Sequence, residues 1–203
     1  MEMSLINQIN AHQQSLRKCR RCVNMIPPVV TGQPVASKVL LVGQAPGDKE
    51  GIMRKPFAWT AGRTMFQWFA SIGLEEEDFR QRVYMAAVCR CFPGKNPKGG
   101  DRVPTEEEIH NCSRWLDAEI ELLRPQLIIP VGKLAIEQFM EVGRLVDMIG
   151  HEFELEENGA VIDVLPLPHP SGASTWHRTE PGISLLRKSL SLIESHPAWQ
   201  AIV

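Results

Sequence analysis

The feature that most constrains the fold of this chain is an alternation of two kinds of segment. Short apolar runs that end in glycine or proline turns alternate with segments that have helical periodicity. Residues 38–42 read KVLLV and run directly into the turn GQAPG at 43–47. Similar apolar runs occupy 83–88, 127–131 and 161–165, and helical spacing occupies 62–72, 105–123, 132–140 and 181–195. Because strands that alternate with helices form parallel sheets covered on both faces, we expect a three-layer α/β/α fold with a central, mostly parallel four-stranded sheet.

The helix expected over 105–123 has the strongest boundary signals. Thr105 can cap its first turn, with Glu108 as the capping-box partner, and Pro125 follows its end. Parallel sheets bind ligands at the carboxyl ends of their strands. The loops 43–50 and 168–177 both follow predicted strands, so they are the candidate site loops.

Length and composition favour one soluble globular unit. The 203 residues contain no internal repeat and no convincing linker, so we expect a single domain over 1–203 that is a monomer. No apolar run approaches the ~18–20 residues of a membrane span, and the N-terminus lacks an apolar signal core, so we expect a cytoplasmic protein without membrane contact. The net charge is −2, but basic residues gather at 17–21 and 95–102, and local positive charge suffices to bind phosphate.

Five cysteines in a cytoplasmic protein are typical of thiols or metal ligands rather than disulfides. Cys19 and Cys22 form a C-x-x-C pair in a basic stretch, and Cys91 and Cys112 follow, with Cys89 close by. Four thiolates suit zinc or an iron–sulfur cluster. The alternative, buried small hydrophobes, is disfavoured by the basic surroundings of the first pair. The segment 92–111 is too long for a zinc-finger knuckle, which disfavours zinc, but spacing alone leaves both metals open.

Five motifs, in order over roughly residues 16–195, resemble those of uracil-DNA glycosylases of the iron–sulfur families 4 and 5. GQAPGDKE at 43–50, followed by KPF at 55–57 and AG at 61–62, is similar to the family 4 pattern GEAPG…E…RPF…AG. The other four motifs lie at 83–96, 104–112, 123–132 and 169–172. The resemblance implies a DNA-repair enzyme that hydrolyses the N-glycosidic bond of uracil, or of other deaminated bases, and leaves an abasic site.

The resemblance also implies a four-iron four-sulfur cluster, whose ligands would be Cys19, Cys22, Cys91 and Cys112. His169, held between two prolines after a strand, is expected to stabilise the negative charge of the departing base. Gln44 would orient the base or the water, and Glu50, or less favourably Asp48, would activate the water. A solvated loop acid is the alternative role for Glu50.

Further residues are expected to bind DNA that contains the damaged base. Phe57 would stack on the base after it is flipped out of the helix, unless it is a core aromatic. Ser171 and the backbone of 171–174 would hold a phosphate, and the aromatic and basic residues that follow would wedge into or clamp the DNA, unless Trp176 is a packed loop residue. The expected substrate-binding set is Gly43, Ala45, Pro46, Gly47, Phe57, Ala87, Asn96, Ser171, Gly172, Trp176, His177 and Arg178.

Three departures from the family 4 pattern bear on specificity. Gln44 replaces the glutamate of GEAPG, Ala87 replaces the asparagine that reads uracil, as in family 5, and residues 98–102 are extra. They put strict selectivity for uracil in doubt. Residues 92–104 contain no histidine, so a covalent trap of the product is not expected. A non-catalytic protein that binds damaged or single-stranded DNA on the same fold is the alternative, whereas an electron carrier would leave GQAPG and HPSG unexplained.

Overall fold

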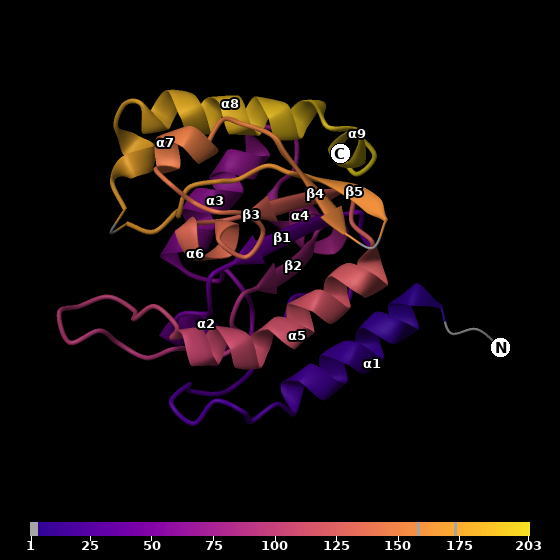
Figure 1. Cartoon of the computed structure of the whole chain (residues 1–203), viewed down its shortest axis with the longest axis vertical. Helices are drawn as coiled ribbons and strands as arrows, with labels where there is room; N and C mark the ends of the chain where they lie inside the picture. Colours follow the sequence, from indigo (N-terminus) through magenta and orange to yellow (C-terminus); the bar gives the residue numbers. More distant parts are fainter. Residues whose placement is uncertain (1–3, 158, 173) are drawn as a thin grey trace.

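Five strands form the central sheet in a computed structural model that describes residues 4–157, 159–172 and 174–203. Their order is β2-β1-β3-β5-β4, and the first four run parallel (Figure 1). Their bounds are β1 Val39–Gly43, β2 Tyr84–Ala87, β3 Leu127–Pro130, β4 Phe153–Glu157 and β5 Ala160–Val164. The expected α/β/α fold with a mostly parallel sheet is confirmed.

The fifth strand, β4, is the one that the sequence did not predict. It pairs antiparallel with β5 at the edge of the sheet, with Leu155 opposite Ile162. Three of its five residues are glutamates, so it lacks the apolar run that marks a buried strand. Charged side chains are typical of edge strands, because they discourage pairing with another chain.

Alternate residues of the strands face opposite layers of helices. Val39 and Leu41 pack in one core with α3 (Thr60–Ala70), α4 (Glu76–Arg82), α8 (Gly182–Ser195) and α9 (Pro197–Gln200). Leu40 and Val42 pack in the other core with α1 (Leu5–Arg17) and α5 (Glu106–Leu123). Figure 1 shows α8 on one side of the sheet and α5 with α1 on the other. The two-residue period of an extended strand therefore builds both layers.

The predicted boundaries of α5 are confirmed. Thr105 Oγ1 accepts a hydrogen bond from the Glu108 N–H at 3.3 Å, and the Thr105 N–H donates to Glu108 Oε2 at 2.8 Å. The three acids of its first turn face the positive end of the helix dipole. The helix ends at Leu123, ahead of Pro125.

The remaining elements are short. They are α2 (Asp48–Met53), α6 (Lys133–Ile136), α7 (Leu145–Met148) and a 3-10 turn at Trp176–Arg178. The helix expected over 132–140 is thus limited to four residues, and α1, α2, α4, α7 and α9 were not predicted. No helix among the described residues combines the length and the hydropathy needed to cross a membrane.

Candidate active site at the carboxyl ends of the strands

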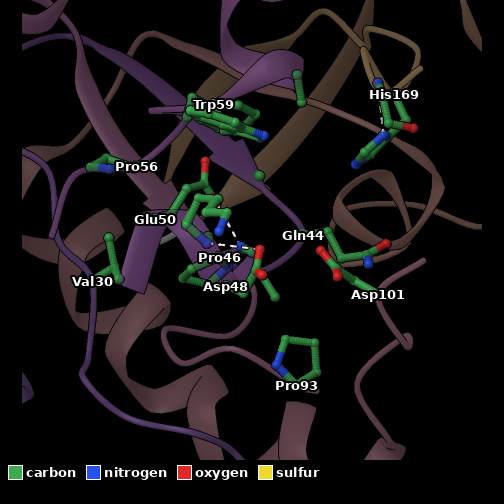
Figure 2. A pocket seen from close by; sticks show the side chains of 18 of the residues that line it. Val30, Gln44, Pro46, Asp48, Glu50, Pro56, Trp59, Pro93, Asp101 and His169 are labelled. Carbon is green, nitrogen blue, oxygen red and sulfur yellow. Dashed lines mark hydrogen bonds between the residues drawn. The ribbon is translucent and has the colours of Figure 1, made fainter. Parts of the chain in front are cut away.

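A cavity of about 700 Å³ lies where the parallel strands end (Figure 2). The loop after β1, the last residues of β2 and the segment after β5 all contribute to its lining. Gly43 and Ala87 are paired in register, so the ends of β1 and β2 lie side by side. Both loops that the sequence singled out, 43–50 and 168–177, contribute residues to the lining, as expected for a parallel sheet.

The turn after β1 supplies one wall of this cavity. The lining includes Gly43, Gln44, Ala45, Pro46, Gly47, Asp48 and Glu50, as the sequence predicted. Glu50 Oε2 accepts a hydrogen bond from the Gly47 N–H at 2.7 Å, and Oε1 accepts one from the Ala58 N–H at 3.2 Å. Burial raises the pKa of Glu50, while these backbone bonds oppose the rise. Both carboxylate oxygens therefore hold backbone, so Glu50 positions the turn, and its expected role in activating water stays a prediction.

Phe57 lies against the floor of the cavity in a strained conformation. Its φ of 51° is in the left-handed region, which costs a residue with a side chain about 1–3 kcal/mol. Buried Arg80 holds it there: Nη2 donates to the Phe57 carbonyl at 3.1 Å and Nη1 donates to the Pro56 carbonyl at 2.8 Å. A Cβ on Gly43 would lie 2.9 Å from the Phe57 ring, so only glycine allows this approach. The ring lines the cavity and also packs against the core, so it serves in both of the roles weighed from the sequence.

His169 enters the cavity from the segment after β5, and Figure 2 shows its ring pointing inwards. The Ser171 N–H donates to His169 Nδ1 at 3.2 Å, so Nδ1 is unprotonated and Nε2 carries the proton. Burial, and then the charge of His177, lower the pKa of His169. Gly132 has a φ of 87°, and a Cβ there would lie 2.9 Å from His169 Cδ2. The site thus holds a neutral imidazole whose N–H is available to the cavity.

Several predicted contact residues lie outside the cavity lining. Asn96 Oδ1 accepts a hydrogen bond from the Lys98 N–H at 2.9 Å and stabilises a turn, so its expected contact with the base is not supported. Trp176 packs against a small core of Ile136, Met148 and Ile149, which is the alternative weighed for it. His177 is buried, with its ring 5.3 Å from that of Trp68.

The rest of this segment is divided between the cavity and its surroundings. Ser171 lines the cavity, whereas Gly172 and Arg178 are exposed outside its lining. The expected phosphate-binding backbone, 171–174, includes residue 173, which lies outside the described residues. Ala87 lines the cavity and offers it no polar side-chain atom.

Two of the lining residues that were not predicted from the sequence bear on the chemistry of the site. Trp59 is 52% exposed at the start of α3 and lines the cavity, so it is the exposed aromatic at this site, in place of Trp176. Asp101 belongs to the extra residues and also lines the cavity. The sequence did contain a signal for the hairpin that carries Asp101, because the Gly99-Gly100 dipeptide just before it favours a tight hairpin turn.

A second cavity, of about 230 Å³, brings the cysteines together. Its walls include Cys19 and Cys22 after α1, Cys89 and Cys91 after β2, and Cys112 on α5. No three of these sulfurs lie within 4.8 Å of one another in the described part of the chain. The five thiols nevertheless line one cavity, and converging thiolates of this kind suit zinc or an iron–sulfur cluster.

The electrostatics of this cavity favour a cationic occupant. Burial, followed by the charges of Cys112, Cys19 and Cys22, raises the pKa of Cys91 to about 11. A hydrogen bond from Cys89 lowers the pKa of Cys112 to about 7. Converging thiolates that oppose one another's ionisation are stabilised when a metal centre binds, because ligation deprotonates the thiols. Cys89 contacts Cys112, and its assignment as the cysteine outside the ligand set stays a prediction.

A third group of possible ligands, Glu152, Asp163 and His196, does not fit a metal. His196 Nδ1 accepts a hydrogen bond from the Ala198 N–H at 3.1 Å, which caps α9. Its proton is then on Nε2, 3.0 Å from Asp163 Oδ2, and a protonated nitrogen has no lone pair for a metal. This group is explained by the helix cap and by the hydrogen bond between His196 and Asp163.

Comparison with known proteins agrees with this geometry. A sequence model of the uracil DNA glycosylase superfamily matches residues 29–190. The chain belongs to this superfamily. It is 30% identical over 172 residues to a type-4 uracil-DNA glycosylase of Archaeoglobus fulgidus, covering 78% of this chain and 79% of that protein. A type-4 uracil-DNA glycosylase of Thermotoga maritima is 29% identical over 167 residues, with the same shares covered.

More distant similarities include a type-5 enzyme and a solved structure. A type-5 uracil-DNA glycosylase of Pyrobaculum aerophilum is 28% identical over 128 residues, covering 57% of this chain and 53% of that protein. The crystal structure of SMUG2 from Pedobacter heparinus matches with a TM-score of 0.52 and 12% identity, covering 96% of this chain and 98% of that one. At that identity the likeness speaks for the fold alone.

Proposed function

We propose that this chain is a DNA-repair glycosylase that hydrolyses the N-glycosidic bond of uracil in DNA and leaves an abasic site. The observation that carries the proposal is the neutral His169 imidazole, whose protonated Nε2 is available to the same cavity that Phe57 lines. Membership of the uracil DNA glycosylase superfamily and the likeness to type-4 enzymes support the reaction class.

In this reaction the target base is flipped out of the DNA and enters the cavity, because its sugar bond is inaccessible within the duplex. The Phe57 ring stacks on the flipped base. His169 Nε2–H donates a hydrogen bond to the base carbonyl oxygen, where negative charge develops as the C1′–N bond breaks. A neutral imidazole suits this role, since the donor is fixed in place before the charge appears.

The pocket favours a broader choice of base than uracil alone. Ala87 gives the end of β2 no amide to read the pairing edge of the base, and the cavity of about 700 Å³ is roomy. A site without such polar atoms leaves none of them unpaired when another base enters, so it does not reject that base on this ground. We therefore include deaminated purines such as hypoxanthine among the substrates.

We infer that Cys19, Cys22, Cys91 and Cys112 hold a four-iron four-sulfur cluster. When bound, the cluster links three distant segments through iron–thiolate bonds: the residues after α1, the residues after β2, and α5. Metal ligation of this kind contributes to folding free energy. The four cysteines that would hold the cluster line a different cavity from His169 and Phe57, so we propose a structural role for the metal centre.

We also propose that the chain acts as one domain and as a cytoplasmic monomer on single- or double-stranded DNA. Helices from α1 to α9 cover one sheet, which supports the single domain. The alternative, a protein that binds damaged DNA without cutting it, is favoured by the absence of a carboxylate at position 44.

Release of the free base distinguishes these functions. The purified protein is mixed with oligonucleotides that contain uracil, hypoxanthine, xanthine or thymine, in single- and double-stranded form, and released base is quantified by chromatography. A glycosylase releases base in proportion to the abasic sites formed, and His169→Ala is the negative control. Binding without release from any substrate would favour the non-catalytic function.

A further inference from the structure

Asp101 lies at the cavity although it is far along the chain from the turn that it faces. It lines the same cavity as Gln44 and His169 (Figure 2). Its Oδ2 approaches Gly47 so closely that a Cβ on that glycine would lie 3.1 Å away. The carboxylate therefore faces the turn after β1, in the wall that carries Gln44.

A tight hairpin holds Asp101 in this place. Lys95 and Asp101 form an isolated antiparallel bridge, and Lys95 Nζ pairs with Asp101 Oδ1 at 2.6 Å. Arg102 anchors the base of the hairpin through two hydrogen bonds to Glu108, at 2.6 and 2.7 Å, at the start of α5. Rigid support of this kind is what a catalytic side chain needs.

Each of the other polar side chains of the turn lacks a carboxylate or uses at least one carboxylate oxygen in a hydrogen bond to the turn itself. Gln44 cannot take a proton. Both oxygens of Glu50 accept backbone hydrogen bonds, from Gly47 and Ala58. Asp48 Oδ1 accepts a hydrogen bond from the Lys49 N–H at 2.8 Å. Asp101 Oδ1 is paired with Lys95, and its Oδ2 faces the loop at the cavity.

We propose that Asp101 is the catalytic carboxylate of this site, supplied by the 95–101 hairpin because Gln44 in the turn after β1 offers only an amide. The inference rests on the proposed glycosylase function. The base leaves with both electrons of the C1′–N bond, and the sugar becomes cationic. Water then forms the C1′–O bond while Asp101 takes its proton, which passes through solvent to the base anion, so no further reactant is consumed. The carboxylate also stabilises the sugar cation before the attack.

Asp101→Asn tests this role with little change of shape. Its amide oxygen can still accept from Lys95, but it cannot take a proton. Single-turnover release of uracil at saturating enzyme should slow about 100-fold or more, the range of general-base catalysis. Affinity for the uracil-containing strand should stay the same or rise, because one negative charge fewer faces the phosphates. Loss of a merely structural contact would weaken binding as well.

Asp147→Asn is the matched control, since it makes the same change in an exposed aspartate that pairs with Arg144 at 2.9 Å and lies outside the lining of both cavities. Its single-turnover rate should stay within about threefold of wild type, well short of a general-base loss. The proposal is overturned if Asp101→Asn cleaves at the wild-type rate, if it loses rate and affinity alike, or if Asp147→Asn is equally slow. A wild-type protein that releases no base would instead refute the proposed function itself.

Discussion

His169→Ala is the perturbation whose size the structure determines best. The substitution removes the Nε2–H of His169. The Ser171 N–H orients the ring by donating to Nδ1 at 3.2 Å, and Gly132 lets the ring lie close to the strand ends because it has no Cβ. The partner of the Nε2–H, a negatively charged carbonyl oxygen, exists only as the C1′–N bond breaks. One such donor is commonly worth about 10²–10³ in rate, or about 2.7–4 kcal/mol.

The assay must separate binding from chemistry. Single-turnover release of uracil from a labelled oligonucleotide gives the rate, and fluorescence anisotropy with the same oligonucleotide gives the affinity. We expect the rate to fall by about 10²–10³ while the affinity changes little, because the ground state lacks the charge that His169 meets. His151→Ala removes an exposed imidazole just before β4 and serves as the control, with wild-type values for both.

Equal losses of affinity and rate in His169→Ala would refute this reasoning. They would mean that His169 contributes to the ground state as much as to the transition state. A wild-type rate in the variant would remove His169 from the chemistry altogether.

Three further predictions follow from the two cavities. Alanine at any one of Cys19, Cys22, Cys91 or Cys112 should abolish the brown colour and the absorbance near ~400 nm of an iron–sulfur protein and should lower Tm, whereas Cys89→Ala should keep the absorbance and the Tm of the wild type. Stoichiometric zinc without iron after anaerobic purification would contradict the cluster. Ala87→Asn should increase the preference for uracil over hypoxanthine; a wild type already restricted to uracil, with a variant that is merely slower, would place selectivity elsewhere. Burial lowers the pKa of His169, so this residue is protonated in the unfolded chain before it is protonated in the folded protein as pH falls through about 6.5. The free energy of unfolding, measured by chemical denaturation, should therefore decrease below that pH relative to His169→Gln, and a difference between the two proteins that stays constant with pH would contradict this shift.

The elements that the sequence predicted are those with a local signal. The apolar run at 38–42 became β1, because alternate residues of a buried parallel strand need apolar partners on both faces. The capping box of Thr105 and Glu108 fixed the start of α5 in the same way, since both partners lie within one turn. The edge strand β4 was missed because its glutamates face solvent and leave no apolar run.

The site was predicted in part, and the misses have physical reasons. His169 and the turn after β1 follow strands, so the rule for parallel sheets places them together. Trp176 was misjudged because an aromatic beside basic residues resembles a DNA contact, whereas its packing against Met148 depends on the distant segment before β4. Asp101 returns to the cavity only through its hairpin, and no pattern within its own segment shows which way the carboxylate faces.

The most direct test of the account is whether the purified wild-type protein releases free uracil from single-stranded DNA that contains one uracil. Chromatography of the released base and alkaline cleavage of the strand measure the two products independently. The account predicts equal amounts of free uracil and abasic sites, formed by the wild type and slowed by about 10²–10³ in His169→Ala. Tight binding of the same strand with neither product formed would contradict it.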